Sequence, residues 1–505
     1  MFFKNPEKLI RIATLATLSF MVVWGLVLVI AQIQPFWVDE WRIIYNLKFK
    51  TAATIWGPLD YMQQFPRIYI AILKAFTSIF DYSYFTLRLP SYLVGTFTIF
   101  FCYRLMNRMY AKDNFNRFLF IMILVSCSTF TGYYVQIKQY TMDILLSVLA
   151  IWQFMELLEI KTLMPLRSGR YVLLCTSLLV VPFFSYSYPI AIAPAFIILF
   201  IQSISLLKSK ESVQGKRKIL FLKWLPAALC AFSITVFYIT DVSQLMQDGG
   251  MHRFWGHLMM KNGFSWQSFF INVYNLFAEI GSGFVFWLLL GTLGCISFAF
   301  GIYTSFKNRN EINSTPMLIR LYCVALLVLV IVLYLAGKLP LGEPRLNAFT
   351  IPAISILLIY FLDSISLRTA KKRIVRALSV IIYIGVIGNI YTTFLASITG
   401  TEYKKKMHIY RSTENAIMLA QANKLPILIT PEVAYPYDKT ENLPFTTTIP
   451  GDWVLKTFPA YKLEDNIQVV AISDTADIKD AMKQLPAGTT SVLVGDGQSY
   501  KIINK

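Results

Sequence analysis

Charged residues are scarce in this chain of 505 residues, and acidic residues are scarcer than basic ones. Charged residues make up 15% of the sequence, against about 25% in an ordinary soluble domain. The 28 Asp and Glu residues are outnumbered by 47 Lys and Arg residues, and 56% of positions are apolar. Together with a mean hydropathy of +0.54, this composition excludes a soluble enzyme and indicates a chain embedded in a bilayer. Because the basic residues lie between apolar runs, we predict membrane lipids as partners and no nucleic acid.

Cysteine and histidine are also rare, which limits the disulfides and metal sites that the chain can form. All six Cys residues fall inside predicted membrane spans, so no disulfide framework is predicted. The three His residues are His252, His257 and His408. The first two are five residues apart, a spacing that does not place them on one helical face as ligands four apart would be. We predict no His-rich metal cluster, and the sequence leaves dependence on a divalent cation open.

Apolar runs of the length of a membrane helix dominate the first 400 residues. A perpendicular span needs about 20 residues, and the shorter runs require tilt or local thinning of the bilayer. The predicted spans are 9–31, 87–103, 118–134, 140–158, 171–184, 188–207, 219–239, 284–303, 318–336, 348–362 and 377–395. We therefore predict an α-helical polytopic membrane protein with about eleven transmembrane helices.

The positions of Lys and Arg predict which ends of these helices face the cytoplasm, because loops rich in these residues stay inside. With the N-terminus inside, the predicted cytoplasmic segments hold 24 of the 47 Lys and Arg residues, and the opposite loops between spans hold 11. We therefore place the N-terminus in the cytoplasm and the C-terminus outside the cytoplasmic (inner) membrane.

The transmembrane domain is predicted to cover residues 1–399, with two long outer loops at 32–85 and 240–281. Within the first loop, Arg67–Phe80 is apolar, but it is only 14 residues long and carries Lys74. If this segment crossed the bilayer, a basic loop would move outside, against the charge rule. We predict a helix that lies on the outer face of the membrane.

Residues 400–505 are predicted to form a small α/β domain outside the membrane. From residue 401 onward, basic and acidic residues balance at 12 each, as in a soluble domain. Strand-like runs occur at 424–433 and 468–473, and a further run at 490–495 follows a predicted helix at 475–485. The sequence Val494-Gly-Asp-Gly differs from phosphate-binding loops and predicts a tight turn.

Three predicted outer turns each combine a carboxylate with a cation, and charged groups near a bilayer are costly enough to be functional candidates. The residues are Asp39, Glu40 and Arg42 after the first span; Lys138, Tyr140 and Asp143 between the third and fourth; and Lys338, Glu343 and Arg345 between the ninth and tenth. Structural roles would also explain them: a salt bridge in an aromatic belt, capping of a helix by Asp143, and an ion pair or snorkelling of Lys338.

This combination of groups suits a lipid-phosphate substrate at the outer boundary of the bilayer. Arg and Lys bind phosphate, and a carboxylate can take a proton from an attacking hydroxyl. A phosphate leaving group departs as a stable anion and needs no general acid, unlike the leaving group in glycoside hydrolysis by paired carboxylates.

Several of these segments resemble a known family. The matching motifs are Asp39-Glu-x-Arg, Phe65-Pro-Arg67-Ile-Tyr-Ile, Leu87-Arg88-Leu-Pro-Ser, Lys138-Gln-Tyr140 with Asp143, and Pro344-Arg345 followed by Pro352. The chain resembles the GT-C superfamily of integral-membrane glycosyltransferases, specifically the family 39-like group related to protein O-mannosyltransferases and lipid A aminoarabinose transferases. The likeness covers roughly residues 1–400.

The resemblance implies an inverting transfer of a sugar from a polyprenyl-phosphate carrier to a lipid, glycan or protein hydroxyl on the outer face. It implies that Asp39 is the base and that Glu40 positions either the acceptor or the base. It implies phosphate-binding roles for Arg42, Lys138 and Arg345, and a role for Arg88 in holding the first outer loop against the spans. The supporting residues would be Arg67, Tyr140, Asp143, Lys338 and Glu343.

The chain also departs from the family, and two other functions fit parts of the sequence. Gln136 and Lys138 occupy positions at which many relatives have a sequence like Glu-x-Arg. Dependence on a divalent metal ion differs among relatives. A transporter of lipid or sugar would show repeated halves and midplane charges, whereas here the charges gather at one face. An oligosaccharide ligase or polymerase would use a long outer loop, and the 240–281 loop is rich in aromatic residues that could stack on sugars.

Overall fold

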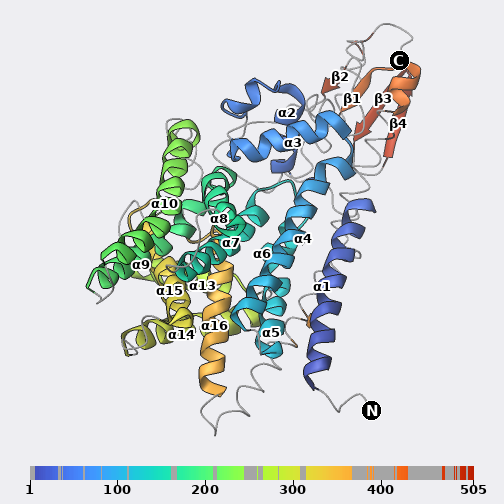
Figure 1. Cartoon of the computed structure of the whole chain (residues 1–505). Coiled ribbons are helices and arrows are strands. Elements are labelled where there is room, and N and C mark those ends of the chain that lie inside the picture. The colour runs from blue at the N-terminus through green and yellow to red at the C-terminus, as the bar shows by residue number, and fades with distance from the viewer. Residues whose placement is uncertain are drawn as a thin grey trace.

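The computed structural model of the chain is an array of α-helices with a small sheet near the C-terminus (Figure 1). It describes residues 6–31, 36, 38–60, 63–80, 82–110, 113–160, 168–208, 213–243, 259, 265–281, 284–307 and 314–366. Farther along it describes residues 384, 387–388, 391, 415, 418–429, 469–471, 483, 485, 490–495 and 499–504.

Within these residues, eight helical segments are long and apolar enough to cross a membrane. They comprise α1 (Pro6–Ile30), α4 (Tyr84–Met109), α7 (Tyr140–Glu159), α9 (Tyr188–Lys208), α10 (Val213–Phe237) continued by the π-helical η4 (Tyr238–Val242), α14 (Phe284–Lys307), α15 (Thr315–Leu335) and α16 (Ile351–Ser366) preceded by the 3-10 helix η7 (Pro344–Thr350). The shorter apolar helices are α5 (Asn114–Ser126) and α8 (Gly169–Val180), which continues as η3 (Val181–Phe184). The fold is that of a multi-pass membrane protein.

Ten of the eleven predicted spans correspond to these helices, and the predicted span at 377–395 falls almost entirely outside the described residues. The predicted span at 118–134 is divided, because α5 ends at Ser126 and a separate helix, α6 (Ser128–Tyr133), follows Cys127. The extended backbone of Cys127 interrupts the helix at an apolar position.

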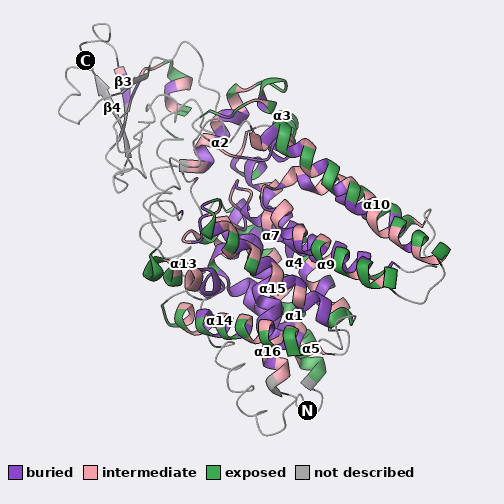
Figure 2. Cartoon of the chain, turned by 90° about the vertical axis from the view of Figure 1, so that its left-hand side faces the viewer, coloured by how far each residue is buried: buried purple, intermediate pink, exposed green. Residues whose placement is uncertain are grey.

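The helix α7 lies at the centre of the array. It packs against α4, α9 and η7, and buried residues gather on the central helices in Figure 2. Large apolar side chains are exposed on the outer helices, including Phe200 on α9, Phe232 on α10 and Phe284 on α14. Such surfaces are costly in water, and they suit contact with lipid.

Two short helices cover one end of the array, and the N-terminal end of α1 lies at the other end (Figure 1). These helices are α2 (Val38–Phe49) and α3 (Arg67–Phe80), with the 3-10 turn η2 (Thr54–Trp56) between them. The bounds of α3 are those predicted for the surface helix. Its buried face includes Ile70 and Leu73, and its exposed face is also apolar, with Ile72 and Ile79. A further helix, α13 (Trp266–Ala278), lies within the second predicted outer loop.

The C-terminal segment contains a four-stranded mixed sheet of order β2-β1-β3-β4. Strand β1 (Ile427–Ile429) pairs in parallel with β2 (Val469–Ala471) and β3 (Thr490–Gly495), and β4 (Ser499–Asn504) pairs antiparallel with β3. The first three strands lie in the predicted runs, whereas β4 was not predicted. The predicted helix at 475–485 falls almost entirely outside the described residues.

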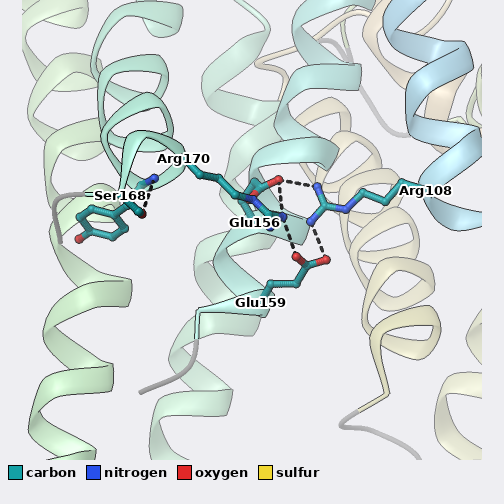
Figure 3. A network of polar contacts seen from close by, with 6 residues as sticks. Arg108, Glu156, Glu159, Ser168 and Arg170 are labelled. Carbon is teal, nitrogen blue, oxygen red and sulfur yellow. Dashed lines mark hydrogen bonds and ion pairs between the residues drawn. The ribbon is translucent and has the colours of Figure 1, made fainter. Parts of the chain in front are cut away.

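Four charged side chains connect α4, α7 and α8 where α4 and α7 end and α8 begins (Figure 3). Arg108 contacts Glu156 and Glu159 at 2.6 Å each, and Arg170 contacts the same two carboxylates at 2.5 and 2.6 Å. The guanidinium of Arg108 also lies 5.0 Å from the ring centre of Trp152. Because each Arg contacts both Glu residues, the network ties together the ends of three helices.

We expect Glu156→Gln to lower the free energy of unfolding by about 1–3 kcal/mol, because it removes the more buried of the two carboxylates that Arg108 and Arg170 share and leaves both cations with Glu159 alone. The Glu156 side chain is only 9% exposed. Denaturant unfolding of the purified protein in detergent would measure the loss. Glu7→Gln, at an exposed acidic position in the first turn of α1, is the matched control and should change nothing. Equal unfolding midpoints for the two variants would contradict a stabilising role for the network.

Candidate functional site

The first turn of α2 carries a carboxylate that faces three cations from three separate segments. Asp39 lies 3.5 Å from Arg42 of the same helix, 3.4 Å from the ammonium of Lys138 and 3.9 Å from the guanidinium of Arg345. Lys138 precedes α7, and Arg345 lies at the start of η7. The structure therefore brings together residues that are about 100 and 300 positions apart in the sequence.

The adjacent Glu40 has a different environment, since its side chain is only 1% exposed. One carboxylate oxygen lies 3.0 Å from Arg88 of α4, and the other accepts a hydrogen bond of 2.8 Å from the backbone N–H of Ile137. The Arg88 guanidinium lies 4.9 Å from the ring centres of both Phe36 and Tyr84. Glu40 thus connects α2 to α4 and to the turn before Lys138. Of the two roles expected for Glu40, these contacts favour positioning of Asp39 over binding of an acceptor.

The turn that carries Lys138 is held in place by Tyr134. The ring of Tyr134 lies so close to α1 and α4 that a Cβ atom added at Gly25 or Gly95 would come within 2.4 Å of it. Its hydroxyl is 3.1 Å from that of Thr96. Glycine at these two positions therefore allows the ring to pack between the helices and positions the segment that leads to Lys138.

Lys138 and Arg345 each have a second polar partner near Asp39. The ammonium of Lys138, which is 5% exposed, donates a hydrogen bond of 3.1 Å to the side-chain oxygen of Gln63. The Nε of Arg345 lies 2.8 Å from Glu343, and Tyr133 lies beside the same guanidinium. Both cations are thereby oriented from one side by protein groups and from the other by Asp39.

The electrostatics of this cluster keep Asp39 ionised. Burial on its own would raise the pKa of the Asp39 carboxyl, but the charges of Lys138, Arg42 and Arg345 outweigh burial and hold the pKa below its ordinary value. Burial lowers the pKa of Lys138 from its ordinary value, and the charge of Asp39 opposes that change.

Five other predicted site residues lie beside this cluster or apart from it. Tyr140, at the start of α7, packs edge-on against Tyr133 with ring centres 4.7 Å apart. Asp143 lies in the first turn of α7 as predicted and accepts a hydrogen bond from Ser185 rather than contacting Lys138. Arg67 is engaged elsewhere, and Lys338 is exposed. Glu343 is paired with Arg345 rather than with Lys338.

Arg67 connects the first outer loop to the end of η4. Its Nε lies 3.3 Å from Asp241, and its backbone N–H donates a hydrogen bond of 3.1 Å to the same carboxylate. Asp241 also accepts a hydrogen bond of 2.8 Å from the hydroxyl of Tyr186. This contact between the two outer loops has a structural role that sequence reasoning did not predict.

Sequence reasoning also missed Gln63, Tyr133 and Asp241. Gln63 lies two residues before the Phe65-Pro66-Arg67 motif, and that proximity was an available signal. Tyr133, near the end of an apolar run, and Asp241, in a long loop, carried no such signal.

The groups around Asp39 do not fit a divalent cation. A single carboxylate faces three cationic side chains there, whereas hard cations prefer several oxygen ligands. Across the part of the chain that the structure describes, no group of three or more His, Cys, Asp or Glu side chains is placed to hold a metal ion. We therefore assign no step of the chemistry to a metal.

No family model and no curated protein sequence matches the chain. A solved structure of ArnT from Cupriavidus metallidurans, bound to undecaprenyl phosphate, does match, with a TM-score of 0.50 over 96% of this chain and 97% of that one at 11% identity. The chain has the fold of ArnT. This likeness concerns the fold, and it agrees with the polytopic helical fold expected from the sequence.

Two further solved structures match with lower TM-scores. The apo form of the same ArnT gives a TM-score of 0.45 at 12% identity, covering 94% of this chain and 92% of that one. An oligosaccharyltransferase from Archaeoglobus fulgidus, in complex with Zn and sulfate, gives 0.46 at 12% identity, covering 82% of this chain and 60% of that one.

Proposed function

We propose that this protein is an inverting glycosyltransferase that moves a sugar from a polyprenyl-phosphate carrier to an acceptor hydroxyl at the outer face of the cytoplasmic membrane. The observation that carries the proposal is the position of Asp39 within 3.4 Å of Lys138 and 3.9 Å of Arg345. One ionised carboxylate among cations from distant segments provides a base next to a phosphate site. The ArnT structure of the same fold is bound to undecaprenyl phosphate, which supports a lipid carrier.

In the proposed reaction the acceptor oxygen attacks the anomeric carbon from the side opposite the phosphate. The new C–O bond forms while the bond from the anomeric carbon to the phosphate oxygen breaks, and the configuration is inverted. Asp39 takes the proton of the acceptor hydroxyl. The carrier phosphate keeps the electron pair and is stabilised by Lys138 and Arg345, while Arg42 supplies a further cation at the same carboxylate.

This function requires the Asp39 cluster to face the extracytoplasmic side. The Lys and Arg count supports that orientation, with the N-terminus in the cytoplasm and the sheet-containing segment 400–505 outside. Both α2 and the strands lie at the end of the helix array away from the N-terminus in Figure 1.

Arg345→Gln tests the proposed phosphate site. Loss of a charged hydrogen-bond donor to phosphate costs about 1.5–3 kcal/mol, so we expect KM for the donor to rise roughly 10- to 100-fold. Lys338→Gln, an exposed cation on the same predicted outer turn, is the matched control and should leave KM unchanged. The assay follows sugar release from purified monosaccharide carriers with one phosphate, with an oligosaccharide on a diphosphate carrier in parallel. Transfer from the diphosphate carrier alone would overturn the proposal in favour of a ligase.

A further inference from the structure

Asp241 is a buried carboxylate that holds the segment leading into the candidate site. Its side chain is 1% exposed, and it belongs to η4, the π-helical turn at the end of α10. Such turns are rare and occur frequently at functional sites. The carboxylate lies 3.3 Å from the Nε of Arg67 and accepts a hydrogen bond of 2.8 Å from the hydroxyl of Tyr186. Burial of a carboxylate is costly unless it is paired, and these two contacts supply the pairing.

The same carboxylate also fixes the start of α3. The first N–H groups of a helix have no partner within the helix. The backbone N–H of Arg67, the first residue of α3, donates a hydrogen bond of 3.1 Å to Asp241. The helix dipole also favours a negative charge at this end. Asp241 therefore holds both the backbone and the side chain of Arg67, and it determines where α3 begins.

The residues just before Arg67 form a stiff connection toward the candidate site. Pro66 has a fixed φ angle and restricts the residue before it. Phe65 is 1% exposed, and its ring centre lies 5.0 Å from that of Tyr69 in the first turn of α3. A shift of the start of α3 is therefore passed on to Gln63 and is not absorbed by the residues between.

Gln63 and Gln64 contact the turn that carries Lys138. The side-chain oxygen of Gln63 accepts a hydrogen bond of 3.1 Å from the ammonium of Lys138. The backbone carbonyl of Gln64 accepts one of 3.4 Å from the side chain of Gln139. The ammonium of Lys138 also lies 3.4 Å from Asp39. The position of Gln63 therefore sets how this ammonium is shared between an amide oxygen and the carboxylate.

We propose that Asp241 is a positioning residue that acts through Gln63 on Lys138 and thereby strengthens binding of the carrier phosphate. While Asp241 is paired with Arg67, Gln63 holds one side of the ammonium, which stays available to the phosphate. When that pairing is lost, Gln63 shifts, and Lys138 pairs more closely with Asp39. This inference rests on the phosphate site of the proposed function.

A double-mutant cycle on carrier binding tests this route, with the full-length protein in nanodiscs and undecaprenyl phosphate as the probe. Asp241→Asn keeps the shape of the side chain and removes its charge, and Gln63→Met keeps the length of the side chain and removes the amide. We expect Kd to rise about fivefold in Asp241→Asn and about tenfold in Gln63→Met. The double variant should stay near the roughly tenfold rise of Gln63→Met alone, because Asp241 acts only through Gln63.

Independent effects of the two changes would instead multiply to a rise of about 50-fold in the double variant. That result would overturn the inference and leave the proposed function standing. If Asp241→Asn fails to fold, Tyr186→Phe takes its place in the cycle, because it removes only one hydrogen bond to Asp241. Its rise in Kd of about threefold should disappear in the Gln63→Met background.

Glu156→Gln is the matched control for a loss of stability alone. It also removes a buried, paired carboxylate, but Glu156 lies toward the far end of α7 from Lys138. This variant should leave Kd within about twofold of wild type, because distant sites act independently. A rise equal to that of Asp241→Asn would attribute the effect to lost stability and overturn the inference. No binding by wild type would overturn both proposals. Binding that follows the expected cycle without sugar transfer would overturn only the proposed function.

Discussion

Asp39→Asn should lower kcat for sugar transfer about 10²- to 10⁴-fold, the contribution typical of a positioned general base. Asparagine keeps the shape of the side chain but cannot take the proton of the acceptor hydroxyl. KM for the donor should stay level or fall, because Lys138 and Arg345 lose the anion that competes with the phosphate. The measurement is steady-state kinetics with a purified monosaccharide carrier, together with carrier binding in the absence of acceptor.

Asp60→Asn is the matched control for Asp39→Asn. Asp60 belongs to the same outer loop, but its side chain is 51% exposed and pairs with Lys50 at 3.3 Å. This change should leave kcat within about twofold, since exposed ion pairs contribute little. Full turnover by Asp39→Asn, with normal stability, would show that another group accepts the proton.

The low pKa of Asp39 also predicts how activity depends on acid. Because Lys138, Arg42 and Arg345 hold the pKa of Asp39 below its ordinary value, the carboxylate stays ionised at neutral pH. The stability that the ionised form gains from these cations is present at neutral pH and is lost as the pH falls through the lowered pKa. The acid limb of the activity profile should therefore lie below that expected for an ordinary aspartate.

Hydropathy and charge counts predicted most of the helices, because a span needs a long apolar run, whereas the segment that forms α3 is only 14 residues long and carries Lys74. The break at Cys127 was not predicted, since the short Ser126-Cys127-Ser128 stretch lies within a longer apolar span and holds neither Pro nor Gly. Helix α2 was also missed, because its 12 residues mix charged and apolar side chains in a loop. Strand β4 depends on pairing with β3 and has no strong pattern of its own.

The sequence identified the residues of the candidate site but not their partners. Asp39, Lys138 and Arg345 were selected because each stands at a predicted outer turn, and the structure places them in contact. Lys138 and Asp143 were close in sequence, yet they contact different groups, because the start of α7 turns Asp143 toward Ser185. Such choices depend on the packing of helices that a single sequence does not reveal.

The buried pair of Arg88 and Glu40 leads to the prediction with the largest effect on stability. Both side chains are 1% exposed, and their charged atoms are 3.0 Å apart. Arg88→Met leaves Glu40 charged and buried, so we expect a loss of about 3–5 kcal/mol in the free energy of unfolding. Arg88→Lys should be a poor substitute, because lysine lacks the planar group that lies over the rings of Phe36 and Tyr84.

A double variant separates the two roles of this pair. Glu40→Leu combined with Arg88→Met removes both charges, and replacement of a buried ion pair by apolar groups is often close to neutral in stability. We therefore expect denaturant unfolding to show recovery of most of the loss seen in Arg88→Met. Turnover should stay low, because the hydrogen bond from the Ile137 N–H to Glu40 is gone and α2 no longer holds Asp39 against Lys138. Recovery of stability together with full turnover would show that Glu40 has no part in positioning Asp39.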